Sequence, residues 1–185
     1  MRLFVSVDLP PGLAEAVADV QDEFSGASGL NFVDPEQAHI TMKFLSDVPK
    51  RRLERLEAEL DQAVSEAEVD PFEVEFSGVG VFPSRDYISV VWLGVDGGAR
   101  ELTALHESIE QRFVDRGFDP EDHEFTPHVT LARMKHAGGK ELVQEVLDEY
   151  DPGPGSMQVS EVRLTKSDLG HEGPVYSTIH RAALE

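Results

Sequence analysis

The sequence of 185 residues contains no cysteine, which excludes disulfide bonds and thiolate-bound zinc from both its stability and its chemistry. It also contains no apolar run that approaches the roughly 18 residues required for a transmembrane helix. The apolar stretch near the N-terminus is interrupted by Asp8 and is too short for the core of a signal peptide. We therefore expect no contact with a membrane and a cytoplasmic location.

Positive charge is scarce. The chain has 16 basic residues, only five of them lysines, against 36 acidic residues, and its formal net charge is −20. Such a surface repels phosphate backbones at long range, so any nucleic acid would have to be held by local contacts. The carboxylates are spread along the whole chain. This spread suits a surface solvated in concentrated salt, where the Debye length falls to about 3 Å at 1 M, and we expect a protein from a halophile.

The chain also lacks the glycine-rich loops that bind nucleotide phosphates. The segment "SGVGVFP" has neither the lysine nor the spacing of a P-loop, and no GxGxxG follows a predicted strand. No HxH, HExxH or DxD pattern lies near the repeated motif described below. We therefore expect neither a metal ion nor an organic cofactor.

Hydrophobic periodicity predicts strands and helices that are interleaved along the chain. Several neighbouring strands are joined by short turns, which favours an α+β fold with mixed or antiparallel sheets over a doubly wound parallel sheet. One domain over residues 1–185 is expected, with a weak internal duplication about residue 90. Strands are predicted at 2–10, 37–45, 72–83, 86–95, from 128, at 156–169 and at 174–184, and helices at 13–24, 49–68, 99–117 and 140–150.

One short pattern occurs twice: "HITMKFL" at 39–45 and "HVTLARM" at 128–134. In a strand, side chains at i and i+2 share a face, so His39 lies beside Thr41 and His128 beside Thr130. If the two strands meet, two imidazoles and two hydroxyls converge. One histidine can then take a proton from water while the other gives a proton to a leaving oxygen, and the hydroxyls can donate to phosphate oxygens. This set suits metal-free hydrolysis of a cyclic phosphodiester.

The two motifs, the opening "RLFVSVDLP", the "FP" at 82–83, "FTPHVTLARMK" and the closing "SDLGHEGPVYSTI" together resemble the 2H phosphoesterase superfamily. Within it, the chain looks like the RNA 2′,3′-cyclic phosphodiesterase branch, historically called 2′-5′ RNA ligases. The resemblance covers essentially the whole chain. It implies a bilobal fold with pseudo-twofold symmetry, antiparallel sheets lining a central cleft and helices packed outside. It also implies hydrolysis of a 2′,3′-cyclic phosphate to a 2′-phosphomonoester without a metal, and in some members reverse ligation through a 2′-5′ linkage.

Carried over to this chain, the resemblance makes His39 and His128 the acid–base pair, and Thr41 and Thr130 the donors to phosphate oxygens. We assign His39 as the acid and His128 as the base, and the reverse assignment stays open. Arg133 lies in the family-like "TLAR" stretch and is a candidate contact to phosphate or RNA. By parity, Arg133 faces away from Thr130 unless the strand twists or bulges.

Parity also places two further residues of the first motif. Lys43 falls on the same face as Thr41, as a candidate substrate contact with a salt bridge as the alternative, and Phe44 falls in the core. The other five histidines are expected to be solvated or structural.

The expected partner is an RNA that ends in a 2′,3′-cyclic phosphate, or a small cyclic nucleotide, bound to a monomer. Two other functions stay open. The same chemistry can act on ADP-ribose 1″,2″-cyclic phosphate or a 2′-5′ oligoadenylate, because loops around the cleft select the substrate. A non-catalytic module that binds RNA ends is the third reading, although binding alone does not require two complete motifs.

Overall fold

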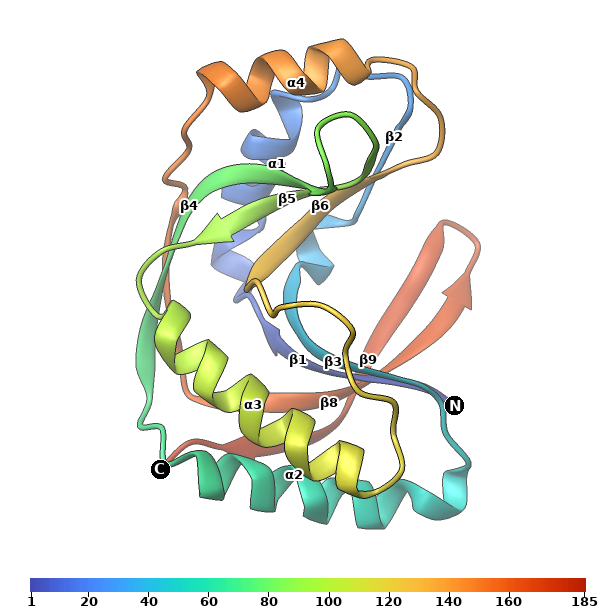
Figure 1. The fold of residues 1–185 in the computed structure, drawn as a ribbon, viewed down its shortest axis with the longest axis vertical. Coiled ribbons are helices and arrows are strands. Elements are labelled where there is room, and N and C mark those ends of the chain that lie inside the picture. The colour runs from blue at the N-terminus through green and yellow to red at the C-terminus, as the bar shows by residue number, and fades with distance from the viewer.

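The computed structural model describes all residues 1–185, as nine strands and four α-helices (Figure 1). The strands are β1 Arg2–Asp8, β2 Leu30–Phe32, β3 His39–Asp47, β4 Phe72–Pro83, β5 Ile88–Val95, β6 His128–Met134, β7 Gly155–Val159, β8 Glu161–Gly170 and β9 Gly173–Ala183. The helices are α1 Ala14–Asp22, α2 Leu53–Ala67, α3 Ala99–Asp115 and α4 Lys140–Glu149. None of the helices combines the length and the apolar composition that crossing a bilayer requires.

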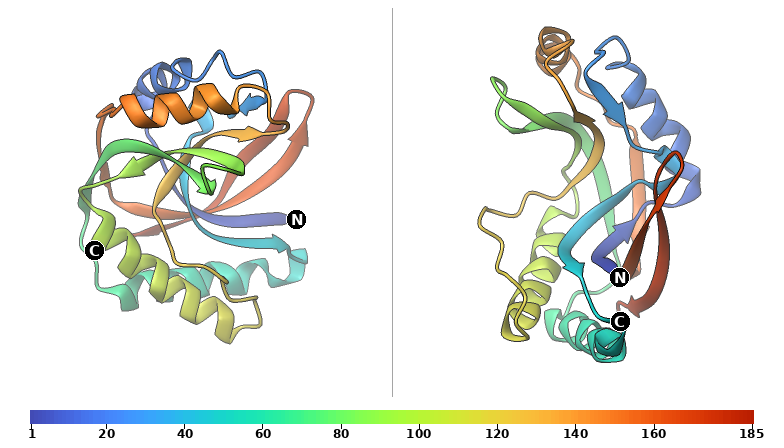
Figure 2. Two further views of the ribbon diagram at one scale, coloured as in Figure 1. Left: turned by 45° about the horizontal axis from the view of Figure 1, so that its top comes forward. Right: turned by 90° about the vertical axis from the view of Figure 1, so that its right-hand side faces the viewer.

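All strands pair antiparallel in one curled sheet of order β7-β4-β5-β6-β3-β1-β8-β9, with β2 paired to β6 (Figure 2). The order is symmetric about the contact between β6 and β3. We call β3, β1, β8 and β9 the β1 half and β6, β5, β4 and β7 the β5 half. The two halves meet through one residue pair, Ile40 and Val129. The expected α+β fold with antiparallel strands, two lobes and outer helices is confirmed.

Each half is covered on its outer face by two amphipathic helices (Figure 1). Helices α2 and α3 cover the β1 half, and α1 and α4 cover the β5 half. Helix α2 buries Leu56, Leu60 and Val64 at helical spacing, and α3 ends beside Gly117, whose φ of +99° suits a glycine. On the other side, the Gln21 side chain of α1 donates to the carbonyl of Leu131 at 3.0 Å. The halves are thus interleaved in sequence, and residue 90 does not divide them.

The strand expected at 156–169 is two strands. β7 pairs with β4 in the β5 half, whereas β8 pairs with β1, so the chain crosses between the halves at Ser160. The buried positions change parity there, from Met157 and Val159 to Val162 and Leu164. The parity of the buried residues changes because β7 and β8 pair with different strands, and the pairing determines which face of each strand is covered.

Both motif strands carry a β-bulge three residues after the histidine. On β3, Ser6 faces Thr41 and Val5 faces Lys43, so Met42 is the extra residue. On β6, the pairs change in the same way and Leu131 is the extra residue. An extra residue reverses the alternation beyond it, so residues five positions after each histidine return to the face of the motif.

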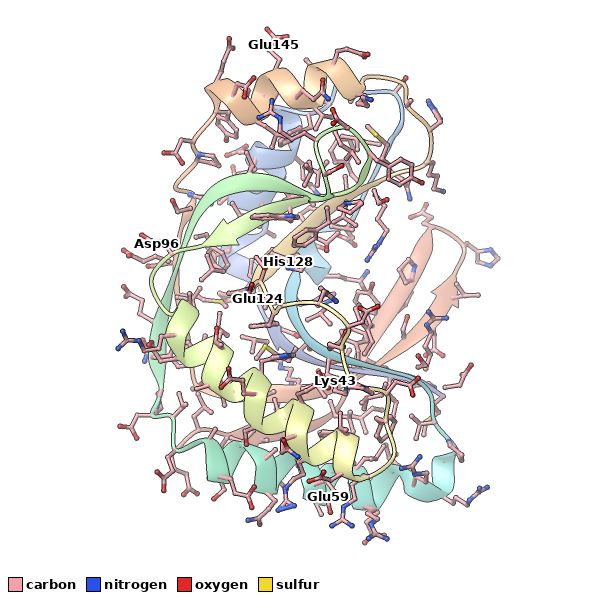
Figure 3. The ribbon with its side chains drawn as sticks, in the orientation of Figure 1. Lys43, Glu59, Asp96, Glu124, His128 and Glu145 are labelled. Carbon is pink, nitrogen blue, oxygen red and sulfur yellow. The ribbon has the colours of Figure 1, made fainter.

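The bulge at Met42 overturns two expectations from parity. Lys43 does not lie beside Thr41: its side chain is buried on the helix side, where Nζ donates to the Glu110 carboxylate of α3 and, at 2.9 Å, to the Asp119 carbonyl. Figure 3 shows Lys43 beside the loop after α3, apart from His128. Lys43 is therefore a salt-bridge residue and no substrate contact. Phe44 is not core, because 59% of it is exposed on the motif face.

We expect Phe44→Ala to lower the free energy of unfolding by less than about 1 kcal/mol, as for other exposed positions. The matched control is Phe113→Ala, which removes a fully buried ring of α3 and should cost about 3 to 5 kcal/mol. Urea unfolding of the two variants measures the difference. Equal losses of unfolding free energy in the two variants would indicate that Phe44 belongs to the core.

Candidate active site

The two motifs meet at the centre of the sheet. Because Ile40 faces Val129 in antiparallel register, His39 lies across from Thr130 and Thr41 lies across from His128. Ile40 and Val129 are fully buried on the helix side. The two imidazoles and two hydroxyls therefore share the opposite face, as the sequence predicts.

Each imidazole is held by the same hydrogen bond. Nδ1 of His39 lies 2.9 Å from the carbonyl oxygen of Gln37, and Nδ1 of His128 lies 2.6 Å from that of Thr126. A carbonyl can only accept, so Nδ1 carries the proton in both rings and Nε2 is left as the base. Two histidines prepared in the same tautomer can each accept, and then return, one proton at Nε2.

The pKa of both histidines lies below the ordinary 6.5, mainly because burial disfavours the imidazolium. For His39, the bond to Gln37 and the Asp8 carboxylate oppose this fall, and the Arg133 cation adds to it. For His128, only the bond to Thr126 opposes the fall, while Arg133, His39 and His123 add to it. The two histidines thus make the same hydrogen bond, but the charged groups around them differ.

Arg133 is brought to the site by the bulge at Leu131. In the paired strands, Trp92 faces Thr130 and Val90 faces Arg133, and Trp92 and Val90 share a face of β5. The guanidinium adds to the fall in the pKa of His39 and His128 that burial causes, and it opposes the rise that burial causes in the pKa of Tyr176. Of the two charged candidates outside the His-x-Thr units, the structure brings Arg133 to the motifs and keeps Lys43 away.

Aromatic rings flank both histidines. Phe4 and Tyr176 lie 5.0 and 5.2 Å from the His39 ring, measured between ring centroids. Phe82 and Trp92 lie 4.9 and 6.0 Å from the His128 ring. These rings displace water around the imidazoles, which accounts for the burial that lowers their pKa.

Sequence reasoning missed Gln37, whose side chain makes contacts of its own in addition to the hydrogen bond between its carbonyl and His39. Its side chain donates to the carbonyl of Pro174 and accepts from the backbone N–H of Tyr176, both at 2.9 Å. It therefore ties the β8–β9 hairpin to the segment that precedes His39. The sequence carries no signal for this contact, since 137 positions separate Gln37 from Pro174.

A pocket opens on the same face directly beside His39. We call it the His39 pocket. It is lined by β1, β8 and β9 and by the turn before β3, through Phe4, Asp8, Leu9, Glu36, Gln37, Ala38, His39, Arg163, Thr165, Tyr176 and Thr178. Asp8 and Arg163, two of the lining residues, are joined by an ion pair of 3.0 Å.

Known proteins match this chain over nearly its whole length. The sequence profile that describes the 2′-5′ RNA ligase superfamily matches residues 9–171. The chain belongs to this family. The RNA 2′,3′-cyclic phosphodiesterase of Methanothermobacter thermautotrophicus is 38% identical over 96% of this chain and 95% of that protein. The enzyme of the same name from Archaeoglobus fulgidus is 37% identical over 97% of this chain and 98% of that protein.

Solved structures agree on the fold. The crystal structure of TT0787 of Thermus thermophilus superposes with a TM-score of 0.82, covering 100% of this chain and 98% of that one at 26% identity. Escherichia coli LigT complexed with 3′-AMP superposes with a TM-score of 0.79 over 99% of this chain and 97% of that one, at 24% identity. The curled sheet with outer helices is therefore the fold that this family shares.

The unequal charge around the two rings can be tested by Asp8→Asn. Loss of the carboxylate removes a stabilising partner of the His39 imidazolium, so the pKa of His39 should fall further while that of His128 stays unchanged. NMR titration of the imidazole resonances measures both values. A fall of equal size in both histidines would contradict the placement of Asp8 on the His39 side.

Proposed function

We propose that this protein hydrolyses the 2′,3′-cyclic phosphate end of RNA to a 2′-phosphomonoester, with His39 and His128 as a general acid–base pair. The observation that carries the proposal is the convergence of both His-x-Thr motifs on one face about Ile40 and Val129. The names of the archaeal relatives, RNA 2′,3′-cyclic phosphodiesterase, support the same reaction.

In this proposal, Nε2 of neutral His128 takes a proton from a water molecule as the water oxygen bonds to phosphorus. The bond from phosphorus to O3′ breaks on the opposite side, and Nε2–H of protonated His39 gives its proton to O3′. The products are a 2′-phosphomonoester and a 3′-hydroxyl. The two histidines end with their protonation states exchanged, and solvent protons restore them.

The charge around the rings supports this assignment of acid and base. Asp8 faces His39 across β1 and β3, whereas Gly94 holds the corresponding position opposite His128. The carboxylate favours a proton on His39, and no carboxylate opposes the fall in the pKa of His128, which favours the neutral base there; Arg133 lowers the pKa of both rings.

Thr41, Thr130 and Arg133 complete the proposed phosphate site. The hydroxyls lie beside the imidazoles and can donate to the non-bridging oxygens, on which charge builds up in the transition state. Arg133 supplies the nearby positive charge. With 36 acidic and 16 basic residues in the chain, this local set must hold the RNA end, because the surface as a whole repels the backbone.

The proposal is tested with 2′,3′-cyclic CMP and with an RNA oligomer ending in a 2′,3′-cyclic phosphate, assayed in high salt with EDTA. We expect the 2′-phosphate as product, and losses in kcat of at least about 10²-fold in both His39→Ala and His128→Ala. His171→Ala, in the exposed turn between β8 and β9, is the matched control and should keep full activity.

A 3′-phosphate product would reverse the roles of the two ester oxygens and contradict the proposed mechanism. Full activity in either active-site variant would remove that histidine from the acid–base pair. Loss of activity in EDTA would show that a metal ion takes part.

A further inference from the structure

The loop that leads into the second motif is held by side chains rather than by its own backbone. Residues 119–127 connect α3 to β6, and none of them takes part in a hydrogen bond between backbone groups. Most of them are exposed. The carbonyl that accepts from Nδ1 of His128, at 2.6 Å, belongs to Thr126 near the end of this loop. The direction of the His128 ring therefore depends on whatever fixes the loop.

The turn before His39 is built differently. Gln37, whose carbonyl accepts from Nδ1 of His39, ends a short 3-10 turn, and its own N–H donates to the carbonyl of Asp34 at 2.9 Å. A backbone bond thus helps to fix the carbonyl that orients His39. The carbonyl that orients His128 has no such support from the backbone of its loop.

Lys43 holds the start of the loop. Its Nζ donates to the carbonyl of Asp119 at 2.9 Å and to the carboxylate of Glu110 on α3. The other carboxylate oxygen of Glu110 accepts from the N–H of Glu121 at 3.1 Å. Lys43 is only 2% exposed, and a buried ammonium is costly unless it is paired and hydrogen-bonded. These bonds therefore fix where the loop leaves α3.

His106 of α3 holds the end of the loop. Its ring stacks on that of Phe125, with the centroids 4.0 Å apart and the planes 6° from parallel. Nδ1 of His106 lies 2.8 Å from the carbonyl of Met42, which can only accept, so the buried ring donates a hydrogen bond that restrains its rotation. Phe125 directly precedes Thr126. A fixed His106 ring therefore fixes the segment that carries the Thr126 carbonyl.

Both contacts begin at the bulge of the first motif strand. Met42 and Lys43 are consecutive residues of β3, and their partners on α3 lie one helical turn apart. Figure 3 shows the loop after α3 running past Lys43 to His128. The strand that carries His39 thus holds, together with α3, the loop that orients His128.

We propose that Lys43 and His106 are positioning residues for His128: they fix the loop at both ends, so that the Thr126 carbonyl keeps the proton of His128 on Nδ1. This inference rests on the proposed function, in which Nε2 of His128 is the base. When the loop is released, the carbonyl no longer selects the tautomer, and the proton can occupy Nε2 instead. A nitrogen that already carries a proton cannot take one from water.

Two variants release the loop. Lys43→Met replaces the ammonium by an apolar side chain of similar length. Phe125→Ala removes the stacked ring from a half-buried loop position, so it tests the proposal even if Lys43→Met does not fold. In both, we expect ¹⁵N NMR of the imidazole nitrogens to show a mixture of tautomers at His128 in place of the Nδ1–H tautomer alone. His39 in the same molecule is the internal reference and should keep its single tautomer.

Each variant has a matched control. Arg112→Met removes a cation of α3 that is paired with Glu59 and Glu66 of α2, at 3.1 and 2.9 Å, and Phe125→Tyr keeps a flat ring against His106. Both controls should keep the single tautomer of His128. A single tautomer in Phe125→Ala or in folded Lys43→Met would overturn the proposal. So would an equal change at His39, or the same change in Arg112→Met, because either would indicate general loosening of the fold.

The rate should fall together with the tautomer. With 2′,3′-cyclic CMP, we expect kcat of Lys43→Met and Phe125→Ala to fall by about 10- to 100-fold, as for a catalytic group displaced by up to about 1 Å. KM should change much less, because the proposed phosphate contacts Thr41, Thr130 and Arg133 belong to strands and not to the loop. An unchanged kcat beside an altered tautomer would contradict the positioning role.

The NMR measurement separates this proposal from the hydrolytic function. A single tautomer at His128 in every variant, with normal turnover by the unmodified protein, would overturn the positioning role and leave the hydrolysis standing. No turnover by the unmodified protein, with a tautomer mixture confined to His128 of Lys43→Met and Phe125→Ala, would contradict the hydrolysis. The control of the His128 ring by Lys43 and His106 would then still stand.

Discussion

The candidate active site depends on a single backbone contact, the antiparallel pairing of Ile40 with Val129. It is the pair through which the two halves of the sheet meet, and both side chains are completely buried on the helix side. Antiparallel register about one pair has local twofold symmetry, so any residue flanking Ile40 must lie across from its counterpart flanking Val129. Each imidazole therefore lies beside the hydroxyl of the other motif. The proposed chemistry needs both copies because each copy supplies half of a site that exists only at their junction.

The matching bulges extend this symmetry by three residues, and the equivalent positions beyond them carry different side chains in the two halves. The bulges at Met42 and Leu131 make Phe44 equivalent to Arg133, and Lys43 equivalent to Ala132. The first pair of positions lies on the face of the motif histidines, with an exposed ring in one half and a cation in the other. The second pair faces the helices, where Lys43 is paired with Glu110 and Ala132 is fully buried. A duplicated backbone thus keeps the positions, while the side chains at equivalent positions differ in charge and size.

The sequence predicts the elements that obey simple periodicity and misses those set by pairing partners. The faces of His39, Thr41, His128 and Thr130 follow from alternation, because these residues precede the bulges. Lys43 and Phe44 are misplaced because one extra residue at Met42 reverses the alternation, and neither the composition nor the spacing of the strand marks it. The division of 156–169 at Ser160 is visible in the sequence, because the apolar positions change from odd to even numbers there. The His39 pocket leaves none, since β1, β8, β9 and the turn before β3 meet only in the folded chain.

The strongly acidic composition and the chemistry of the site are consistent if recognition is confined to the end of the RNA. A net charge of −20 repels every phosphate that approaches the outer surface, and salt screens this repulsion within a few ångströms at molar concentration. Contacts inside the site are screened less, because aromatic rings cover part of each imidazole. An internal stretch of RNA would bring many phosphates to the acidic surface and few to Arg133. A chain end brings one phosphate to the motifs and few to the acidic surface, so the same charge that weakens binding of long RNA favours its terminus.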